Sequence, residues 1–192
     1  MKKILGIVAV ILVLSLALTG CNTSTDDKKE DKSLSYTVEE FLDLVINKAV
    51  EEDPDTEYGM KTLIGQKNVV NSENLEDILG ITEDEFNKSI DGAMESKPDD
   101  TWSPHSVIFV KVKDGVDVKE MAEKITMHTR PDRFGCLRPE AVTGTYYDKY
   151  IMIVVSDKET SNVVLKSFDE IVESESPRIE RENDWQISFF EE

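Results

Sequence analysis

The stretch 150-YIMIVVSD-157 decides the fold that the sequence predicts. Its first six residues, Tyr150 to Val155, form an unbroken apolar run, which is typical of a β-strand covered on both faces. The residues that follow are apolar at helical spacing, and they predict a helix after this strand. The apolar positions of that helix are Val163, Val164, Phe168, Ile171 and Val172.

A second strand and a second helix are predicted upstream. The segment Val107 to Val112 is rich in β-branched and aromatic residues and indicates a strand. A helical face begins after Gly115, and Pro131 ends it because proline cannot continue a helix. The residues on this face are Val118, Met121, Ala122, Ile125 and Thr129. We also expect a last short strand over residues 186–190.

The first half of the chain is predicted to be mainly helical. Thr37 and Glu40 have the spacing of a capping box, and apolar residues at helical spacing over residues 38–52 predict an amphipathic helix. A glycine C-cap at Gly80 and a second capping box that begins at Thr82 indicate two further short helices.

Turn signals and the order of elements complete the predicted fold. Residues 60–64 indicate a short extended piece, whereas Asp91-Gly92 and residues 97–100 indicate a polar, turn-rich region. The second half has the order β-α-β-α. The sequence therefore predicts an α+β fold, or a small α/β fold, with a helical N-terminal half and a small sheet.

The N-terminus carries the clearest functional signal. A short basic region and the apolar run Ile4 to Leu18 make a secretory signal peptide. The pattern Leu18-Thr19-Gly20-Cys21 resembles the lipobox of bacterial lipoproteins, in which the cysteine receives lipid and becomes the first residue after cleavage. An uncleaved membrane helix is the alternative, but Ile4 to Thr19 would span only about 24 Å of a hydrocarbon core of about 30 Å.

These signals divide the chain into three predicted parts. Residues 1–20 are a lipoprotein signal peptide, and residues 21–35 are a lipidated tether too polar to fold. Residues 36–192 are a single globular domain. The predicted location is the extracytoplasmic face of the cell membrane, with lipid on Cys21 as the membrane contact.

The charge balance limits the range of partners. The formal net charge is −18, and removal of the signal peptide with its two lysines takes it to −20. Nucleic acid is not expected as a partner, because phosphate binding needs clustered Lys and Arg. Direct adhesion to an anionic leaflet is disfavoured for the same reason. An envelope protein is a possible partner, and we expect a monomer.

The sequence nominates no catalytic residue, cofactor or metal ligand set. His105, His128 and Cys136 have no zinc-site spacing, and a Cys136–His128 nucleophile pair has no recognisable context. With Cys21 acylated, Cys136 has no disulfide partner within the chain. It is then buried, paired between molecules, or reactive.

One irregular segment is the candidate partner-binding region. Residues 129–145 are punctuated by proline and glycine and carry Arg130, Arg133 and Arg138, an unusual basic concentration on so acidic a chain. Long irregular connections are often functional. We expect these arginines to form a positive spot that contacts an acidic group on a partner. The alternative is that they pair with nearby surface carboxylates.

The layout resembles an uncharacterised lipoprotein family of Gram-positive bacteria, domain of unknown function 4358. The resemblance rests on the lipobox, the Ile78-Leu79-Gly80-Ile81 turn, the strand at 107–112, the arginine-proline segment and the stretch 150–157. The family has no established activity, so the resemblance implies fold and anchoring and lends no catalytic residues.

The function expected from the sequence is that of a membrane-anchored extracytoplasmic lipoprotein. Its folded domain is interpreted as a binding or accessory module at the cell envelope, and not as an enzyme. Two alternatives remain open at this stage. One is a small-solute receptor accessory to a transporter, and the other is an envelope hydrolase that uses Cys136 or a pair of carboxylates.

Overall fold

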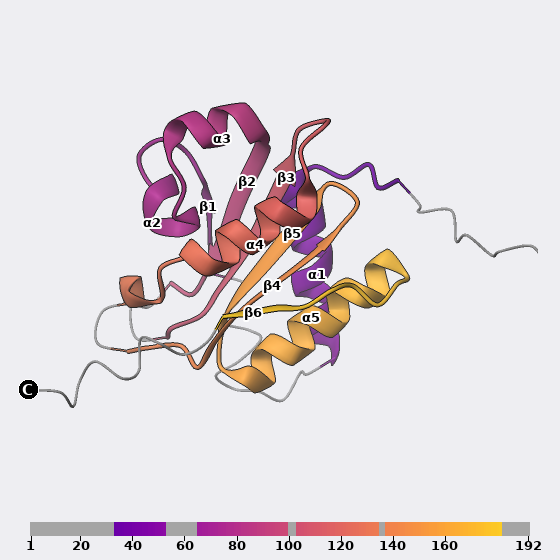
Figure 1. The fold of residues 1–192 in the computed structure, drawn as a ribbon. Helices are drawn as coiled ribbons and strands as arrows, with labels where there is room; N and C mark the ends of the chain where they lie inside the picture. The colour runs from indigo at the N-terminus through magenta and orange to yellow at the C-terminus, as the bar shows by residue number, and fades with distance from the viewer. Residues whose placement is uncertain (1–32, 53–64, 100–102, 135–136, 182–192) are drawn as a thin grey trace, which may run out of the picture. The chain divides into compact units, whose positions relative to one another are not determined.

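A computed structural model describes residues 33–52, 65–99, 103–134 and 137–181 of the chain (Figure 1). The elements in order are α1 (Val38–Glu52), β1 (Gln66–Val69), α2 (Leu75–Leu79), α3 (Glu83–Ser89), β2 (Ile90–Lys97), β3 (Ser106–Val112), α4 (Val118–His128), the 3-10 helix η2 (Pro131–Phe134), β4 (Ala141–Tyr147), β5 (Tyr150–Ser156), α5 (Lys158–Val172) and β6 (Ile179–Arg181).

The strands form one six-stranded sheet in the order β1-β2-β3-β5-β4-β6, and every neighbouring pair is antiparallel. Strand β5 lies inside the sheet between β3 and β4, and all seven of its residues are buried. The prediction of a strand covered on both faces is therefore confirmed. In the register of the central pair, Ser106 faces Val155 and Lys111 faces Tyr150.

Helices cover both faces of the sheet, so the described residues form three layers (Figure 1). Residues of α2 and α4 join the core on one face, with Phe86 of α3 packed against it. Helices α1 and α5 join the core on the other face. Helices packed on an antiparallel sheet make an α+β fold, and the predicted fold class is confirmed.

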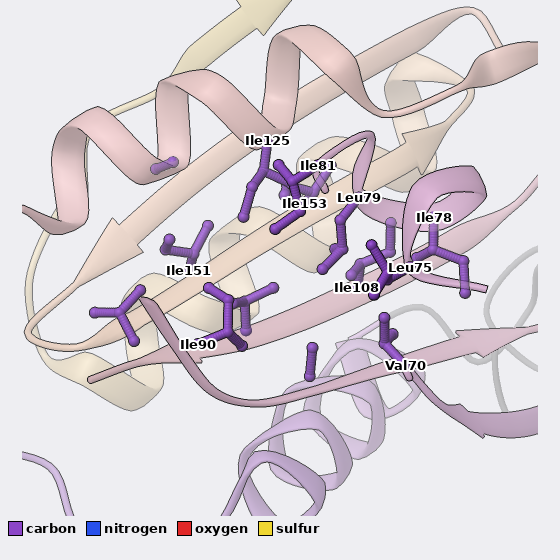
Figure 2. Packing of buried hydrophobic residues seen from close by; sticks show 14 of the residues in the cluster. Val70, Leu75, Ile78, Leu79, Ile81, Ile90, Ile108, Ile125, Ile151 and Ile153 are labelled. Carbon is purple, nitrogen blue, oxygen red and sulfur yellow. The ribbon is translucent and has the colours of Figure 1, made fainter. Parts of the chain in front are cut away.

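The core under α4 is aliphatic and closely packed. Figure 2 shows Ile108, Ile151 and Ile153 of the sheet meeting Leu79 of α2 and Ile125 of α4. These side chains are at most 1% exposed to solvent, as interiors of native packing density require.

Strand β4 approaches α4 closely at a glycine. A Cβ atom on Gly144 would lie 2.0 Å from Oγ1 of Thr126, which itself donates a hydrogen bond of 2.7 Å to the carbonyl of Ala122. The missing side chain of Gly144 therefore lets the helix lie directly on the strand.

The core on the other face is built around aromatic rings. The ring of Phe41 on α1 lies 4.8 Å from that of Tyr150, 5.0 Å from that of Phe109 and 5.4 Å from that of Phe168. This cluster joins the first described helix to the central strands and to α5. Two lysine–glutamate pairs, Lys48–Glu170 and Lys166–Glu52, also bridge α1 and α5 on the surface.

The predicted helix ends agree with the structure. The Thr37 and Glu40 side chains exchange hydrogen bonds with each other's backbone N–H groups at the start of α1. Thr82 and Glu85 form the same capping box at α3. Gly80 ends α2 in the left-handed conformation, with φ of 64°. The two helix starts are fixed by side-chain hydrogen bonds, and the end of α2 is fixed by the backbone conformation of a glycine.

Two predictions of irregular structure are wrong. The stretch around Asp91 and Gly92, predicted to be turn-rich, belongs to strand β2, with an irregularity in register between Ile90 and Gly92. The segment 129–145 is not irregular throughout, because it contains η2 and the first part of β4. In both places the segment pairs with neighbouring strands although it contains small and polar residues.

Several predictions concern residues outside the described ranges. They are the signal peptide, lipidation of Cys21, the fate of Cys136, the extended piece at 60–64 and the strand at 186–190. None of the helices in the described ranges combines the length and the hydrophobicity of a membrane-spanning segment.

Candidate functional site

The two ends of the sheet differ in chemistry. We call the end where β3 begins and β5 finishes, at Ser106 and Ser156, the polar end. We call the end where β4 turns into β5, at Tyr147 and Tyr150, the hairpin end. The polar end holds two buried polar clusters, built around Ser106 and Ser156, together with an open groove.

A buried charge pair lies at the polar end, on the face covered by α4. Glu95 of β2 forms an ion pair with Arg133 of η2, and their side chains are 2% and 13% exposed. The hydroxyl of Ser106 donates a 2.6 Å hydrogen bond to the Glu95 carboxylate and accepts one of 2.9 Å from Arg133. The three residues come from three different elements, so this cluster fixes η2 onto the sheet.

The cation of this cluster is further held by an aromatic ring. The guanidinium carbon of Arg133 lies 4.6 Å from the centre of the Phe134 ring, within the range of a cation–π contact. Among the described residues, Nε of Arg133 is buried without a hydrogen-bond acceptor. Since its other two nitrogens contact Glu95 and Ser106, we assign Arg133 a structural role.

A second polar cluster lies at the same end, on the opposite face. His105 Nδ1 is 2.5 Å from the hydroxyl oxygen of Ser156 and 3.9 Å from the carboxylate of Asp157. The Ser156 hydroxyl also donates a 3.3 Å hydrogen bond to Asp157. The residue types are those of a hydrolase triad, but the serine and the aspartate share one histidine nitrogen and Ser156 is fully buried. This is not the arrangement of a nucleophile, a base and an orienting acid.

Asp157 has a structural task that explains its electrostatics. It is the N-cap of α5, where it accepts 2.8 Å hydrogen bonds from the backbone N–H and the hydroxyl of Thr160. Burial alone would raise the pKa of Asp157. The hydrogen bonds from Thr160 and the nearby His105 outweigh that effect and hold its pKa below the ordinary value.

An open groove lies next to these clusters, between the start of α5 and the β4–β6 edge. Its volume is about 430 Å³, within the range of small-ligand sites. Its lining includes two carboxylates, two cations, two hydroxyls and an amide. The residues that contribute these groups are Glu140, Thr143, Lys158, Ser161, Asn162, Glu180 and Arg181.

The three arginines predicted to bind a partner do not form one exposed patch. Arg130 is 51% exposed and contacts Asp132 and Asp77 at 3.0 Å. Arg133 is the buried partner of Glu95. Arg138 is half-buried, with Nε and Nη1 enclosed. The alternative, in which the arginines pair with surface carboxylates, holds for Arg130. Arg133 instead pairs with a buried carboxylate.

A further arginine, Arg178, organises the C-terminal part and gives no sequence signal. It forms an ion pair with Asp169 of α5 and donates hydrogen bonds of 3.1 Å and 2.9 Å to the hydroxyls of Thr145 and Ser176. This network positions the chain that leads into β6, and so it shapes one wall of the groove.

The described elements thus define an α+β sandwich with several closed polar clusters and an open polar groove. Searches for a group of three or more histidine, cysteine or carboxylate side chains able to hold a metal found none among the residues that the structure describes. Comparisons of the chain with protein-family models, with curated proteins and with solved structures found no match.

Proposed function

We propose that this chain is a lipid-anchored extracytoplasmic lipoprotein whose folded domain acts as a binding or accessory module at the cell envelope. The observation that carries the proposal is the junction Leu18-Thr19-Gly20-Cys21 between an apolar run and a charged, polar segment. Kinship with the lipoprotein family of domain of unknown function 4358 is part of the same proposal. Its support is the set of sequence motifs given above.

The geometry of the polar end favours binding over hydrolysis. Ser106 and Ser156 are both fully buried, so neither hydroxyl can reach a substrate. The groove, by contrast, presents side chains such as Lys158, Asn162 and Glu180, which are exposed. Its walls belong to a sheet and a long helix, and rigid elements of this kind hold recognition groups in place.

The anchoring half of the proposal is tested by Cys21→Ala. Cells that express the wild type or the variant are fed labelled palmitate, and membrane and soluble fractions are compared. The wild type should carry the label and sediment with membranes, because two acyl chains are enough for stable anchoring. The variant should lose the label and either leave the membrane or keep its signal peptide. Equal labelling of both chains would refute the proposal, and Cys136→Ala is the matched control that should label normally.

The binding half is tested by reversing charge in the groove. Glu140→Lys and Glu180→Lys together change the rim without touching the buried clusters. The control is Asp114→Lys at the hairpin end, where Asp114 is 87% exposed. Crosslinking on intact cells should recover envelope partners with the wild type and the control but much less with the groove variant. If the groove variant recovers the same partners in the same amounts, the groove is not the binding site.

A further inference from the structure

The segment that leads into the domain is fixed to the hairpin end. The backbone N–H of Leu34 donates a 3.0 Å hydrogen bond to the carboxylate of Asp148 in the β4–β5 turn. The backbone N–H of Tyr36 donates to the Tyr150 hydroxyl at 2.9 Å, and that hydroxyl donates back to the Tyr36 carbonyl at 2.5 Å. Lys111 donates to the same carbonyl at 3.2 Å. The chain therefore enters the domain beside the β4–β5 turn.

The groove and the buried clusters lie at the other end of the same strands. Strand β5 runs from Tyr150 at the hairpin end to Ser156 at the polar end, a length of roughly 20 Å at about 3.4 Å per residue. Helix α1 starts at the hairpin end, where Val38 lies beside Gly92 of β2. Helix α5 starts at the polar end with Lys158 on the groove.

The hairpin end carries paired charges on a chain whose formal net charge is −18. Lys111 lies 3.9 Å from Asp91, and Lys149 forms an ion pair with Asp114.

We infer that the domain stands on the membrane with its hairpin end toward the lipid and its polar end outward. This inference rests on the proposed anchoring at Cys21. Eleven residues, 22–32, separate Cys21 from the first described residue, and even fully extended the connection reaches only about 40 Å. Because the connection attaches at the hairpin end, that end is held nearer the membrane than the polar end, and steric exclusion places the polar end farther away. The groove is presented to an envelope protein, and not to lipid headgroups.

Energy transfer to labelled lipids tests this orientation directly. The mature chain, with hexahistidine in place of residues 1–21 and with Cys136→Ser, is bound to vesicles that contain a nickel-chelating lipid. A donor dye is attached at Asp114→Cys on the hairpin end or at Glu140→Cys on the groove, and acceptor dyes are carried on lipid headgroups. The matched control carries the hexahistidine after Glu192, since the described chain ends at Arg181 on the groove.

With the N-terminal anchor, transfer from position 114 should be faster than from position 140. Because transfer to a plane of acceptors falls with the fourth power of height, a height difference of roughly 20 Å predicts a ratio of at least about threefold. With the C-terminal anchor the order should reverse. Equal rates at the two positions under the N-terminal anchor, or faster transfer from position 140, would overturn the inference. The vesicle anchor does not depend on acylation in the cell, so failure of lipidation at Cys21 would refute the proposed function and leave this result standing.

Discussion

Two arginines in the same segment should lose very different amounts of stability on the same substitution. Arg133→Gln removes the cation from a Glu95 carboxylate whose side chain is 2% exposed. Loss of one partner of a buried ion pair typically costs about 3–5 kcal/mol, because the other charge remains buried without compensation. Arg130→Gln removes a cation that is 51% exposed. Exposed ion pairs contribute only about 0–1 kcal/mol.

Urea unfolding of the soluble chain that lacks residues 1–21 measures both effects. With a denaturant slope of about 2 kcal/mol per molar, the midpoint of Arg133→Gln should fall by roughly 1.5–2.5 M. The midpoint of Arg130→Gln should fall by less than about 0.5 M. The loss of about 3–5 kcal/mol expected for Arg133→Gln is a large part of the total stability of a domain, which is about 5–15 kcal/mol.

A paired substitution separates the charge effect from simple loss of packing. Glu95→Gln added to Arg133→Gln removes the buried charge, and the amide can still accept the hydrogen bond from Ser106, which spans 2.6 Å in the wild type. The double variant should therefore be more stable than Arg133→Gln alone. If Arg130→Gln and Arg133→Gln destabilise the chain equally, or if the double variant is the least stable of all, the buried pair does not have the role assigned to it.

Two further predictions follow from the packing of α4 and from the cap of α5. Gly144→Ala should lower the free energy of unfolding by about 1–3 kcal/mol, because the new Cβ overlaps Thr126, and Thr126→Ala in the same chain should restore part of the loss in urea unfolding. The pKa of Asp157 is below its ordinary value in the folded chain. The carboxylate therefore contributes its full stabilisation above the pKa of the unfolded carboxyl, about 3.9. This stabilisation is lost as the pH falls through the pKa of the folded chain. Asp157→Asn should therefore reduce the difference in melting temperature between pH 7 and pH 3, and an unchanged difference would show that the hydrogen bonds from Thr160 do not lower this pKa.

The elements that could be predicted are those whose signals are local. The apolar run at 150–155 identifies β5 without reference to any other part of the chain. Capping boxes at Thr37 and Thr82 mark helix starts because the donor and acceptor groups lie within four residues of each other. Gly80 is also a local signal, because glycine readily adopts the left-handed conformation that ends a helix.

The elements that were missed depend on contacts between distant parts of the chain. Strand β2 contains Glu95, whose burial makes sense only with Arg133, thirty-eight residues later in the sequence. Arg130 and Arg133 look alike in the sequence, yet one is exposed and the other is enclosed by the sheet. The groove has no motif, because its rim is assembled from β4, α5 and β6. No periodic pattern in the sequence indicates that side chains from these three elements lie close together.

The contact between α1 and α5 also determines when this chain can finish folding. The first described helix packs on the last one, and Phe41 lies 5.4 Å from Phe168. A chain that emerges from a ribosome or a translocation pore in order from its N-terminus can form the β2–β3 hairpin early, because that pairing is local. The aromatic core, however, stays open until the residues of α5 have also emerged, about 130 positions after the start of α1. Through that interval the apolar face of α1 has no partner helix to cover it, and exposed apolar surface of this kind favours aggregation.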